Sequence, residues 1–530
     1  MFTRKLFKGL LPLLLLFSCH QGLQQNETAL QTKDEAMMVQ QPSQPESKTE
    51  GYSNIVENSF LSAAKDPLST FSIDVDPAAY SNVRRFINGG TLPPEGAVRI
   101  EEMVNYFDYH YAAPQNGDPL AVYTEMAPCP WSPSHRLVHI GLKGKEIPTG
   151  DLPAANLVFL IDVSGSMDDP DKLPLVKSSL KLLTDQLREK DRVAIVTYAG
   201  EAGVALESTS GKNKEKIKDA IDNLGAGGST AGAEGIQRAY QIAKENFIGK
   251  GGNNRVILAT DGDFNVGMSS DDELVRLIEQ ERKSNIFLTV LGFGTGNYQD
   301  SKMQQLADKG NGNHAYIDNI SEAKKVLVKE FGSRLFTIAK DVKLQVEFNP
   351  AKVGAYRLIG YENRLLQKED FNNDEKDAGE LGPGHTVTAL YEVIPVGVKD
   401  DFTGKVDDLK YQKTAETKSD LTDEIMTIKI RYKAPEGDLS KLMVCPVKNE
   451  STDLKSTSDN FRFSAAVAEF GMLLRNSAFK QNAGWQKVLS LAEGAKTADN
   501  DGYRAEFIEL VRSAASLEKN GAKNVSSKED

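Results

Sequence analysis

Apolar residues between positions 154 and 336 follow strand and helix periods in turn. The run Leu157–Ile161 is apolar at every position, as expected of a strand covered on both faces, and a helical period follows over 173–187. The same reading predicts further strands at 193–198, 255–260, 286–292 and 314–317, and helices at 213–222, 232–246, 271–283, 300–309 and 321–336. Such alternation predicts an α/β domain whose mostly parallel sheet carries helices on both faces.

Strand patterns flank this domain on both sides. The region 57–150 reads as helices followed by strands at 119–146, and the region 341–440 is rich in alternating strands. The C-terminal region 455–520 returns to a helical period. We predict that the two strand sets, 119–146 and 341–435, join into one β-sandwich with the α/β domain inserted in a loop, since insertion at exposed loops is well tolerated.

The first 18 residues are typical of a secretory signal peptide. Three basic residues precede a short apolar run, which is too short to span a bilayer. Ser18-Cys19 then resembles a bacterial lipobox, which implies that Cys19 becomes the acylated N-terminus of a lipoprotein. Ordinary cleavage beside an incidental cysteine is the alternative.

Residues 19–56 are rich in Gln, Glu, Ser and Lys and poor in large apolar residues, so we predict a disordered tether. Together with the lipobox, this tether predicts a protein of the bacterial cell envelope that is held on a membrane by its N-terminal lipid. We expect the outer membrane. The sequence leaves open whether the protein faces the periplasm or the exterior.

Composition narrows the choice of partners. The chain has 530 residues, a formal net charge of -12 and a pI near 5.3. Nucleic-acid binders carry a basic stripe, which this acidic chain lacks, so we expect no nucleic acid as partner. Beyond the lipobox, Cys129 and Cys445 are the remaining cysteines, and they are equally compatible with one disulfide in an oxidising compartment or with two free thiols.

Candidate chemistry gathers in three segments of the α/β domain. The first predicted strand runs directly into Asp162, Ser164 and Ser166, Thr230 lies in a glycine-rich loop before a helix, and Asp261 ends a later strand. Ligands of open α/β sheets bind beyond the carboxyl ends of the strands, where these segments meet. Two carboxylates and three hydroxyls, without His or Cys, form a hard oxygen set that suits Mg²⁺ or Mn²⁺, with Ca²⁺ a poorer match.

Asp-x-Ser-x-Ser, a distant Thr and a further Asp resemble the metal-ion-dependent adhesion site of von Willebrand factor A domains, which have a Rossmann-like α/β fold. The resemblance implies that Ser164, Ser166 and Thr230 bind the ion directly. Asp162 and Asp261 would act largely through bound water. It also implies an open coordination position that takes an Asp or Glu side chain of a protein partner, which makes the domain an adhesion-type interaction module.

Other segments are similar to one bacterial subset, the envelope proteins of the YfbK type. The similarity rests on 71–107, 259–267, 291–298 and 356–364, so it spans nearly everything after the tether. It implies a metal-binding module between two family-specific flanks. That subset has no well-defined activity to carry over.

Asp168 and Asp169 follow the first motif and resemble the acidic pair that holds a second metal ion in integrin β subunits. The spacing here is one residue shorter, and a solvated acidic turn is the simpler interpretation. A second metal site at this pair therefore stays an alternative.

Two alternatives to an interaction module stay open. A metal-assisted hydrolase needs a base near the ion, and Asp263 is the one spare acid there. The other is a scaffold in which the metal only orders the loops. The sequence contains no HExxH or Walker A motif, so no catalytic residue is assigned.

Overall fold

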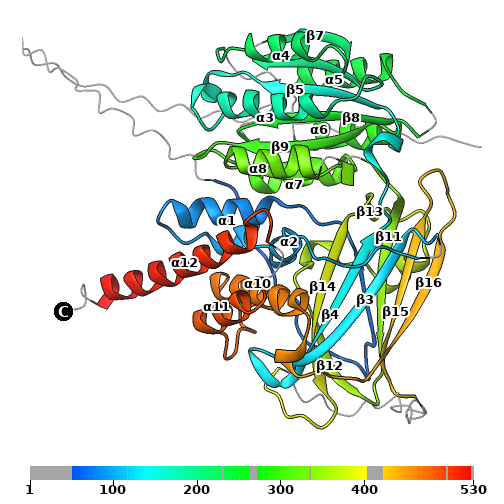
Figure 1. Cartoon of the computed structure of the whole chain (residues 1–530), viewed down its shortest axis with the longest axis vertical. Coiled ribbons are helices and arrows are strands. Elements are labelled where there is room, and N and C mark those ends of the chain that lie inside the picture. The colour runs from blue at the N-terminus through cyan, green and yellow to red at the C-terminus, as the bar shows by residue number, and fades with distance from the viewer. Residues whose placement is uncertain are drawn as a thin grey trace, which may run out of the picture. The chain divides into compact units, whose positions relative to one another are not determined.

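A computed structural model gives the fold of residues 50–526 (Figure 1). Within that range it leaves out Asn116, Gly200, 229–231, Lys250, 263–270, Phe331, 334–335, 403–421 and 497–498. Residues Lys48–Asp530 form one compact unit. The predicted signal peptide and Cys19 lie outside the described residues. No helix among the described residues is long and apolar enough to cross a membrane.

The central domain is built on a six-stranded sheet in the order β10-β9-β8-β5-β6-β7. Its strands are β5 (Ala155–Asp162), β6 (Arg192–Ala199), β7 (Glu201–Ser210), β8 (Asn253–Thr260), β9 (Phe287–Phe293) and β10 (His314–Ile317). All neighbours are parallel except β6 and β7. The antiparallel edge strand β7 was not predicted, because this segment is poor in large apolar residues and its pairing with β6 is interrupted by register shifts.

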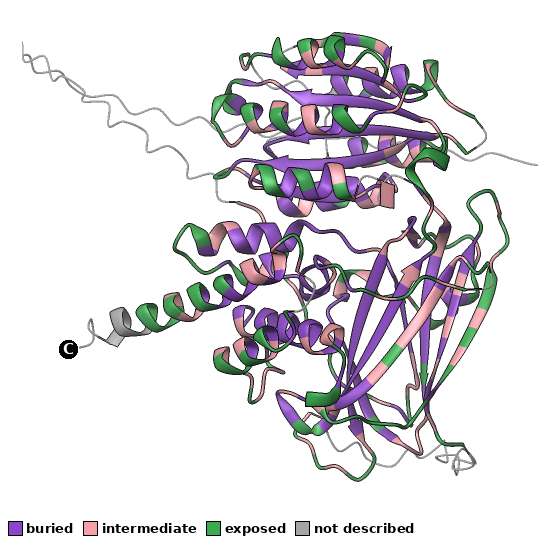
Figure 2. Cartoon of the chain, viewed as in Figure 1, coloured by how far each residue is buried: buried purple, intermediate pink, exposed green. Residues whose placement is uncertain are grey.

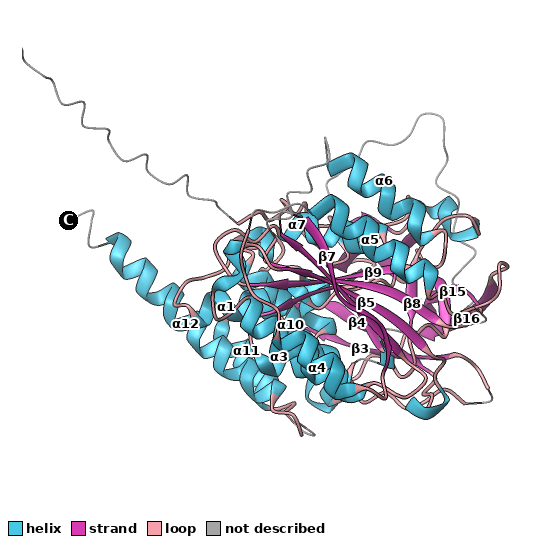
Figure 3. Cartoon of the chain, turned by 90° about the horizontal axis from the view of Figure 1, so that it is seen from above, coloured by secondary structure: helices cyan, strands magenta, loops and turns pink. Residues whose placement is uncertain are grey.

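Helices cover both faces of this sheet (Figure 3). They are α3 (Leu173–Gln186), α4 (Lys214–Asp222), α5 (Gly232–Glu245), α6 (Asp271–Arg282), α7 (Asp300–Lys309) and α8 (Ile320–Lys324). Successive residues of a strand point to opposite faces. In β5, Leu157 and Phe159 accordingly pack with α3 and α4, whereas Val158 and Leu160 pack with α5, α6 and α7. The continuous apolar run therefore contributes to two cores, one on each face of the sheet. Figure 2 colours the strands of this sheet mostly as buried.

The last helix of this domain is shorter than the predicted 321–336. Asn319 caps α8 by accepting hydrogen bonds from Ser321 N and Glu322 N, and the helix widens into a π-helical turn at Lys325–Lys329. The Lys325 ammonium lies 4.4 Å from the centre of the Tyr106 ring. The regular α-helix therefore ends at Lys324, and the π-helical turn that follows it is short, as such turns usually are.

Strands from both sides of the α/β domain form a two-layer β-sandwich. One sheet has the order β1-β12-β14-β4-β3, and the other has β13-β11-β15-β16 with β2 added to β11. The strands are β1 (Leu61–Ser62), β2 (Leu68–Ser72), β3 (Leu120–Cys129), β4 (Ser132–Gly144), β11 (Ala339–Phe348), β12 (Val353–Ile359), β13 (Gly379–Leu381), β14 (Thr386–Pro395), β15 (Glu424–Lys433) and β16 (Lys441–Lys448). Residues of both sheets share one apolar core.

The predicted sandwich is confirmed by the pairing of β4 with β14, in which Ile140 lies opposite Ala389. These strands come from either side of the α/β domain, so that domain is inserted between them. The two cysteines of the sandwich, Cys129 and Cys445, are free thiols in the structure. Burial raises the pKa of the Cys129 thiol well above its usual value, which makes it a poor nucleophile.

Helices from both ends of the chain make a third core beside the sandwich. They are α1 (Ala78–Asn88), α2 (Ile100–Asn105), α10 (Asp459–Leu474), α11 (Trp485–Glu493) and α12 (Tyr503–Ser526). Short 3-10 helices occur at Glu95–Ala97, Thr149–Asp151, Gly165–Asp168, Glu362–Arg364, Lys368–Asn372 and Leu454–Ser456. Most of α10 is buried, because it packs against α2 and α11 at once.

Buried ion pairs join these flanking helices to the α/β domain. Arg84 of α1 donates from Nε to Asp318 and from Nη2 to Glu322, each at 2.8 Å, and from Nη1 to the Tyr106 hydroxyl at 3.1 Å. The side chains of Arg84 and Glu322 are 2% and 1% exposed. Arg99, ahead of α2, makes a similar buried contact with Asp300 at the start of α7.

Replacing Arg84 with Met tests this junction. The change leaves the carboxylates of Asp318 and Glu322 buried without their counter-ion, and breaking such a pair costs about 3–5 kcal/mol. We expect the free energy of unfolding in urea to fall by that amount. Lys212→Met, which removes an exposed pair with Glu189, should leave it unchanged. Equal, small effects of both changes would contradict the role of the junction.

Candidate metal centre

Two carboxylates lie completely buried at the carboxyl ends of neighbouring strands. Asp162 is the last residue of β5, and Asp261 directly follows β8; both are 0% exposed. β5 and β8 are adjacent and parallel, so their ends meet at one edge of the sheet. The topology therefore brings together two acids that lie far apart in the sequence.

Asp162 is held by hydrogen bonds on both carboxylate oxygens. Oδ1 accepts from Ser164 N at 2.9 Å, and Oδ2 accepts from the Tyr198 hydroxyl at 3.0 Å and the Thr260 hydroxyl at 3.2 Å. Burial raises the pKa of Asp162, while the hydrogen bonds from Ser164 act in the opposite direction. These contacts fix the turn after β5, so that the carboxylate positions the serines that follow.

The two serines of the motif lie side by side. Ser164 Oγ and Ser166 Oγ are 3.1 Å apart; Ser164 is buried, whereas Ser166 is exposed. The glycine-rich loop docks onto this turn, because Gly165 N donates to Gly228 O at 3.2 Å and Gly227 N donates to the carbonyl of residue 163 at 2.8 Å. Thr230 lies outside the described residues, two positions after Gly228. The described part of the glycine-rich loop, up to Gly228, is thus anchored at the site.

Asp261 receives donors that the sequence did not reveal. Its Oδ2 accepts from Lys172 Nζ at 3.0 Å and from Asn297 Nδ2 at 3.1 Å. Burial alone would raise the pKa of Asp261, but the hydrogen bonds from Asn297 and Lys172 outweigh it and lower the pKa. Asp261 therefore stays ionised inside the protein.

Lys172 supplies positive charge beside the serine turn. Its Nζ also donates to Ser166 O at 2.9 Å and lies 3.8 Å from the Asp169 carboxylate. The side chain passes over Gly294, where a Cβ would come within 2.5 Å of its carbons and where φ is +74°. A glycine is needed at this position for both reasons. The glycine-rich segment after β9 thus makes room for Lys172 and carries Asn297.

The segment that follows the tether also contacts this loop. Gly296 N donates to Glu50 Oε1 at 3.0 Å, Gly51 N donates to Tyr298 O at 3.0 Å, and Glu50 pairs with Arg85 at 2.8 Å. The predicted tether boundary at residue 56 is therefore too late. Backbone pairing and an ion pair hold residues from Glu50 onward, which composition alone did not indicate.

Asp168 and Asp169 end a short 3-10 turn, and both are exposed. No group of three or more His, Cys, Asp or Glu side chains that could hold a metal occurs among the described residues. The acidic pair thus has the features of a solvated turn. Asp263, the acid considered for hydrolysis, lies outside the described residues.

The donor set fits a hard divalent cation. Ser164 and Ser166 offer paired hydroxyls near the surface, and Asp162 and Asp261 offer buried negative charge behind them. Asp162 already accepts three hydrogen bonds, which suits a carboxylate that acts through bound water. Mg²⁺ and Mn²⁺ prefer such oxygen donors and retain several waters, so an exposed side remains available for a further ligand.

Comparison with known proteins identifies the class. Residues 156–330 match the von Willebrand factor type A domain, residues 46–139 match a family described as von Willebrand factor, and residues 333–517 match the C-terminal region of the uncharacterized protein YfbK. The central domain is therefore a von Willebrand A domain, a class that often serves metal-dependent protein interaction and is typically not enzymatic.

The chain is 46% identical to the uncharacterized protein YfbK of Escherichia coli (strain K12) over 474 residues, which are 88% of this chain and 81% of that protein. The chain belongs to the YfbK family. This finding confirms both the fold class and the family that the motifs indicated.

Weaker similarities extend to other proteins. The inter-alpha-trypsin inhibitor heavy chain H3 of Homo sapiens is 26% identical over 172 residues, 31% of this chain and 19% of that protein. A von Willebrand factor type A structure from Catenulispora acidiphila covers 84% of this chain and 89% of its own, at 14% identity and a TM-score of 0.38. A mussel byssus matrix protein with a zinc-occupied MIDAS motif covers 34% of this chain and 45% of its own, at 26% identity and a TM-score of 0.28.

Lys172→Met tests the electrostatics of the site. In EDTA, the change leaves buried Asp261 without its cationic partner, so we expect a loss of about 3 kcal/mol in the free energy of unfolding. In Mg²⁺ the loss should shrink, because the bound ion supplies positive charge. Lys181→Met on α3, which removes an exposed pair with Asp222, should have no effect in either buffer. An equal loss with and without Mg²⁺ would contradict this account.

Proposed function

We propose that this protein is a metal-dependent interaction module that binds an Asp or Glu side chain of a protein partner through Mg²⁺ or Mn²⁺. The observation that carries the proposal is the meeting of two buried carboxylates with two adjacent serine hydroxyls at one edge of the sheet. When bound, the cation supplies a Lewis-acidic position open to an anionic ligand. The two serines would orient the cation, and the two carboxylates would balance its charge.

Each residue has a separate task in this proposal. Ser164, Ser166 and Thr230 would hold the ion directly, and Asp162 and Asp261 would hold its water. Ser166 is exposed, so a partner carboxylate can approach from its side. In this proposal the serine, threonine and aspartate oxygens bind and orient the ion, and no chemical step takes place at the site. We therefore propose an interaction protein rather than an enzyme.

A pull-down from solubilised envelope tests the proposal. The full-length chain is used in Mg²⁺ and in EDTA, beside Asp162→Ala and Ser166→Ala. We expect one protein to be retained in Mg²⁺ and lost in EDTA and in both variants, with Mn²⁺ affinity of Ser166→Ala about tenfold or more weaker in calorimetry.

The matched control is Ser178→Ala on α3, an exposed serine whose hydroxyl donates to Pro174 O of its own helix. It should behave as the unaltered protein does. Retention that is equal in all conditions would mean that the metal merely orders the loops, and partner binding would have to lie on the flanking domains.

We further propose that the protein is a lipoprotein of the bacterial envelope, anchored through acylated Cys19 in the outer membrane. The proposal rests on the signal-like N-terminus and on the lipobox resemblance. Radioactive palmitate fed to cells should label the unaltered chain and not Cys19→Ser. Cys129→Ser is the matched control and should retain the label. Equal labelling of the Cys19→Ser chain would exclude the lipid anchor.

A further inference from the structure

A cavity of about 560 Å³ lies between the von Willebrand A domain and the β-sandwich. The A domain lines it with the start of β8, the end of α6 and the turn between α7 and β10, and the sandwich lines it with the end of β2 and with β13. Arg255 in its wall lies six positions before Asp261, about 20 Å along the strand at 3.3 Å per residue. The cavity is therefore separate from the metal centre.

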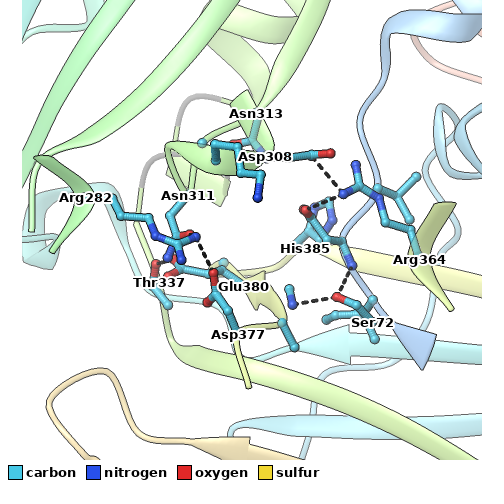
Figure 4. Close-up of a pocket in the computed structure, with 18 of the residues that line it drawn as sticks. Ser72, Arg282, Asp308, Asn311, Asn313, Thr337, Arg364, Asp377, Glu380 and His385 are labelled. Carbon is cyan, nitrogen blue, oxygen red and sulfur yellow. Dashed lines mark hydrogen bonds and ion pairs between the residues drawn. The ribbon is translucent and has the colours of Figure 1, made fainter. Parts of the chain in front are cut away.

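Most charges in the cavity wall have partners (Figure 4). Arg282 pairs with Asp377 at 2.6 Å and also donates to Asn311 at 3.0 Å. Arg364 pairs with Asp308 at 2.8 Å. These pairs balance one another, so they create no demand for a ligand.

Arg255 differs from these residues. It is only 2% exposed, and Nη1 donates to the Thr289 hydroxyl at 2.8 Å. Its Nε is buried without a hydrogen-bond partner, and the guanidinium forms no ion pair with any described residue. The guanidinium carbon lies 5.6 Å from the centre of the Phe287 ring. Burial of a cation without a counter-ion is costly, and here it lowers the pKa of Arg255 to about 10.

Glu380 also lines the cavity, and its carboxylate acts electrostatically on Arg255. Its carboxylate accepts from the Thr337 hydroxyl. Desolvation raises the pKa of Glu380 to about 7; Thr337 and Arg255 oppose this rise, and Asp377 and Asp341 reinforce it. Near neutral pH a large share of Glu380 is therefore protonated. Glu380 therefore compensates the Arg255 guanidinium only in part.

We propose that this cavity binds a small carboxylate ligand and that Arg255 recognises the carboxylate group. A planar guanidinium without an ion-paired carboxylate matches a carboxylate ligand in shape and charge. The amide side chains of Asn311 and Asn313, which also line the cavity, offer hydrogen bonds to the rest of the ligand. This site does not depend on the proposed adhesion function.

Acetate and its uncharged isostere acetamide are suitable probes. We expect acetate, at constant ionic strength, to raise the melting temperature of the full-length chain saturably, by about 2 °C and with millimolar affinity. Acetamide should have no effect. The same comparison is made in EDTA, where the response should persist because the metal centre is not involved.

Arg255→Met should abolish the acetate response while melting at the same or a higher temperature without ligand, because it removes an uncompensated buried charge. Arg512→Met, which removes an ion-paired guanidinium exposed on α12 and outside the cavity wall, should keep an affinity within about threefold of the original. If Arg255→Met does not fold, Arg255→Lys keeps the charge and should bind about tenfold more weakly. Equal effects of acetate and acetamide on the unaltered chain, or an acetate response retained by Arg255→Met, would overturn the proposal.

Discussion

The burial of two carboxylates at the ends of β5 and β8 determines the design of the central domain. An ionised group in the interior must be paired and hydrogen-bonded, and Asp162 and Asp261 are both 0% exposed. Asp162 is satisfied by backbone and hydroxyl donors, whereas Asp261 is satisfied by Lys172 and Asn297. This requirement explains why the Lys172 side chain passes over Gly294 and why the loop after β9 brings Asn297 to Asp261.

Lys172 gives the site a charge of its own before any cation binds. It neutralises Asp261 and is hydrogen-bonded to the backbone of Ser166, so the donors are arranged in advance. A divalent cation would then be attracted by two carboxylates and repelled by one ammonium group. The affinity of the site for the cation would depend on the balance between this attraction and this repulsion. The flanking domains are tied to the same unit through the buried pairs of Arg84 and Arg99, so a partner bound at the site would meet one compact unit.

Sequence periodicity was sufficient for the large elements but not for the contacts between them. The apolar run of β5 and the alternation in the flanking strands followed from local patterns, whereas the pairing of β4 with β14 was inferred from the tolerance of exposed loops for an inserted domain. Lys172 and Asn297 carry no local signal, because their role arises only when the residue before α3 and the loop after β9 meet the end of β8. The edge strand β7 and the attached segment at Glu50 were missed for a similar reason: partners distant in sequence stabilise them.

The most direct test of the metal centre is a crystal structure of the compact unit Lys48–Asp530 grown with Mn²⁺. The account predicts one anomalous peak bound by the hydroxyls of Ser164, Ser166 and Thr230, with Asp162 and Asp261 behind it and a water or a neighbouring carboxylate on the exposed side. A structure that has no manganese at this edge of the sheet, and in which Lys172 is the only cation beside Asp261, would contradict it.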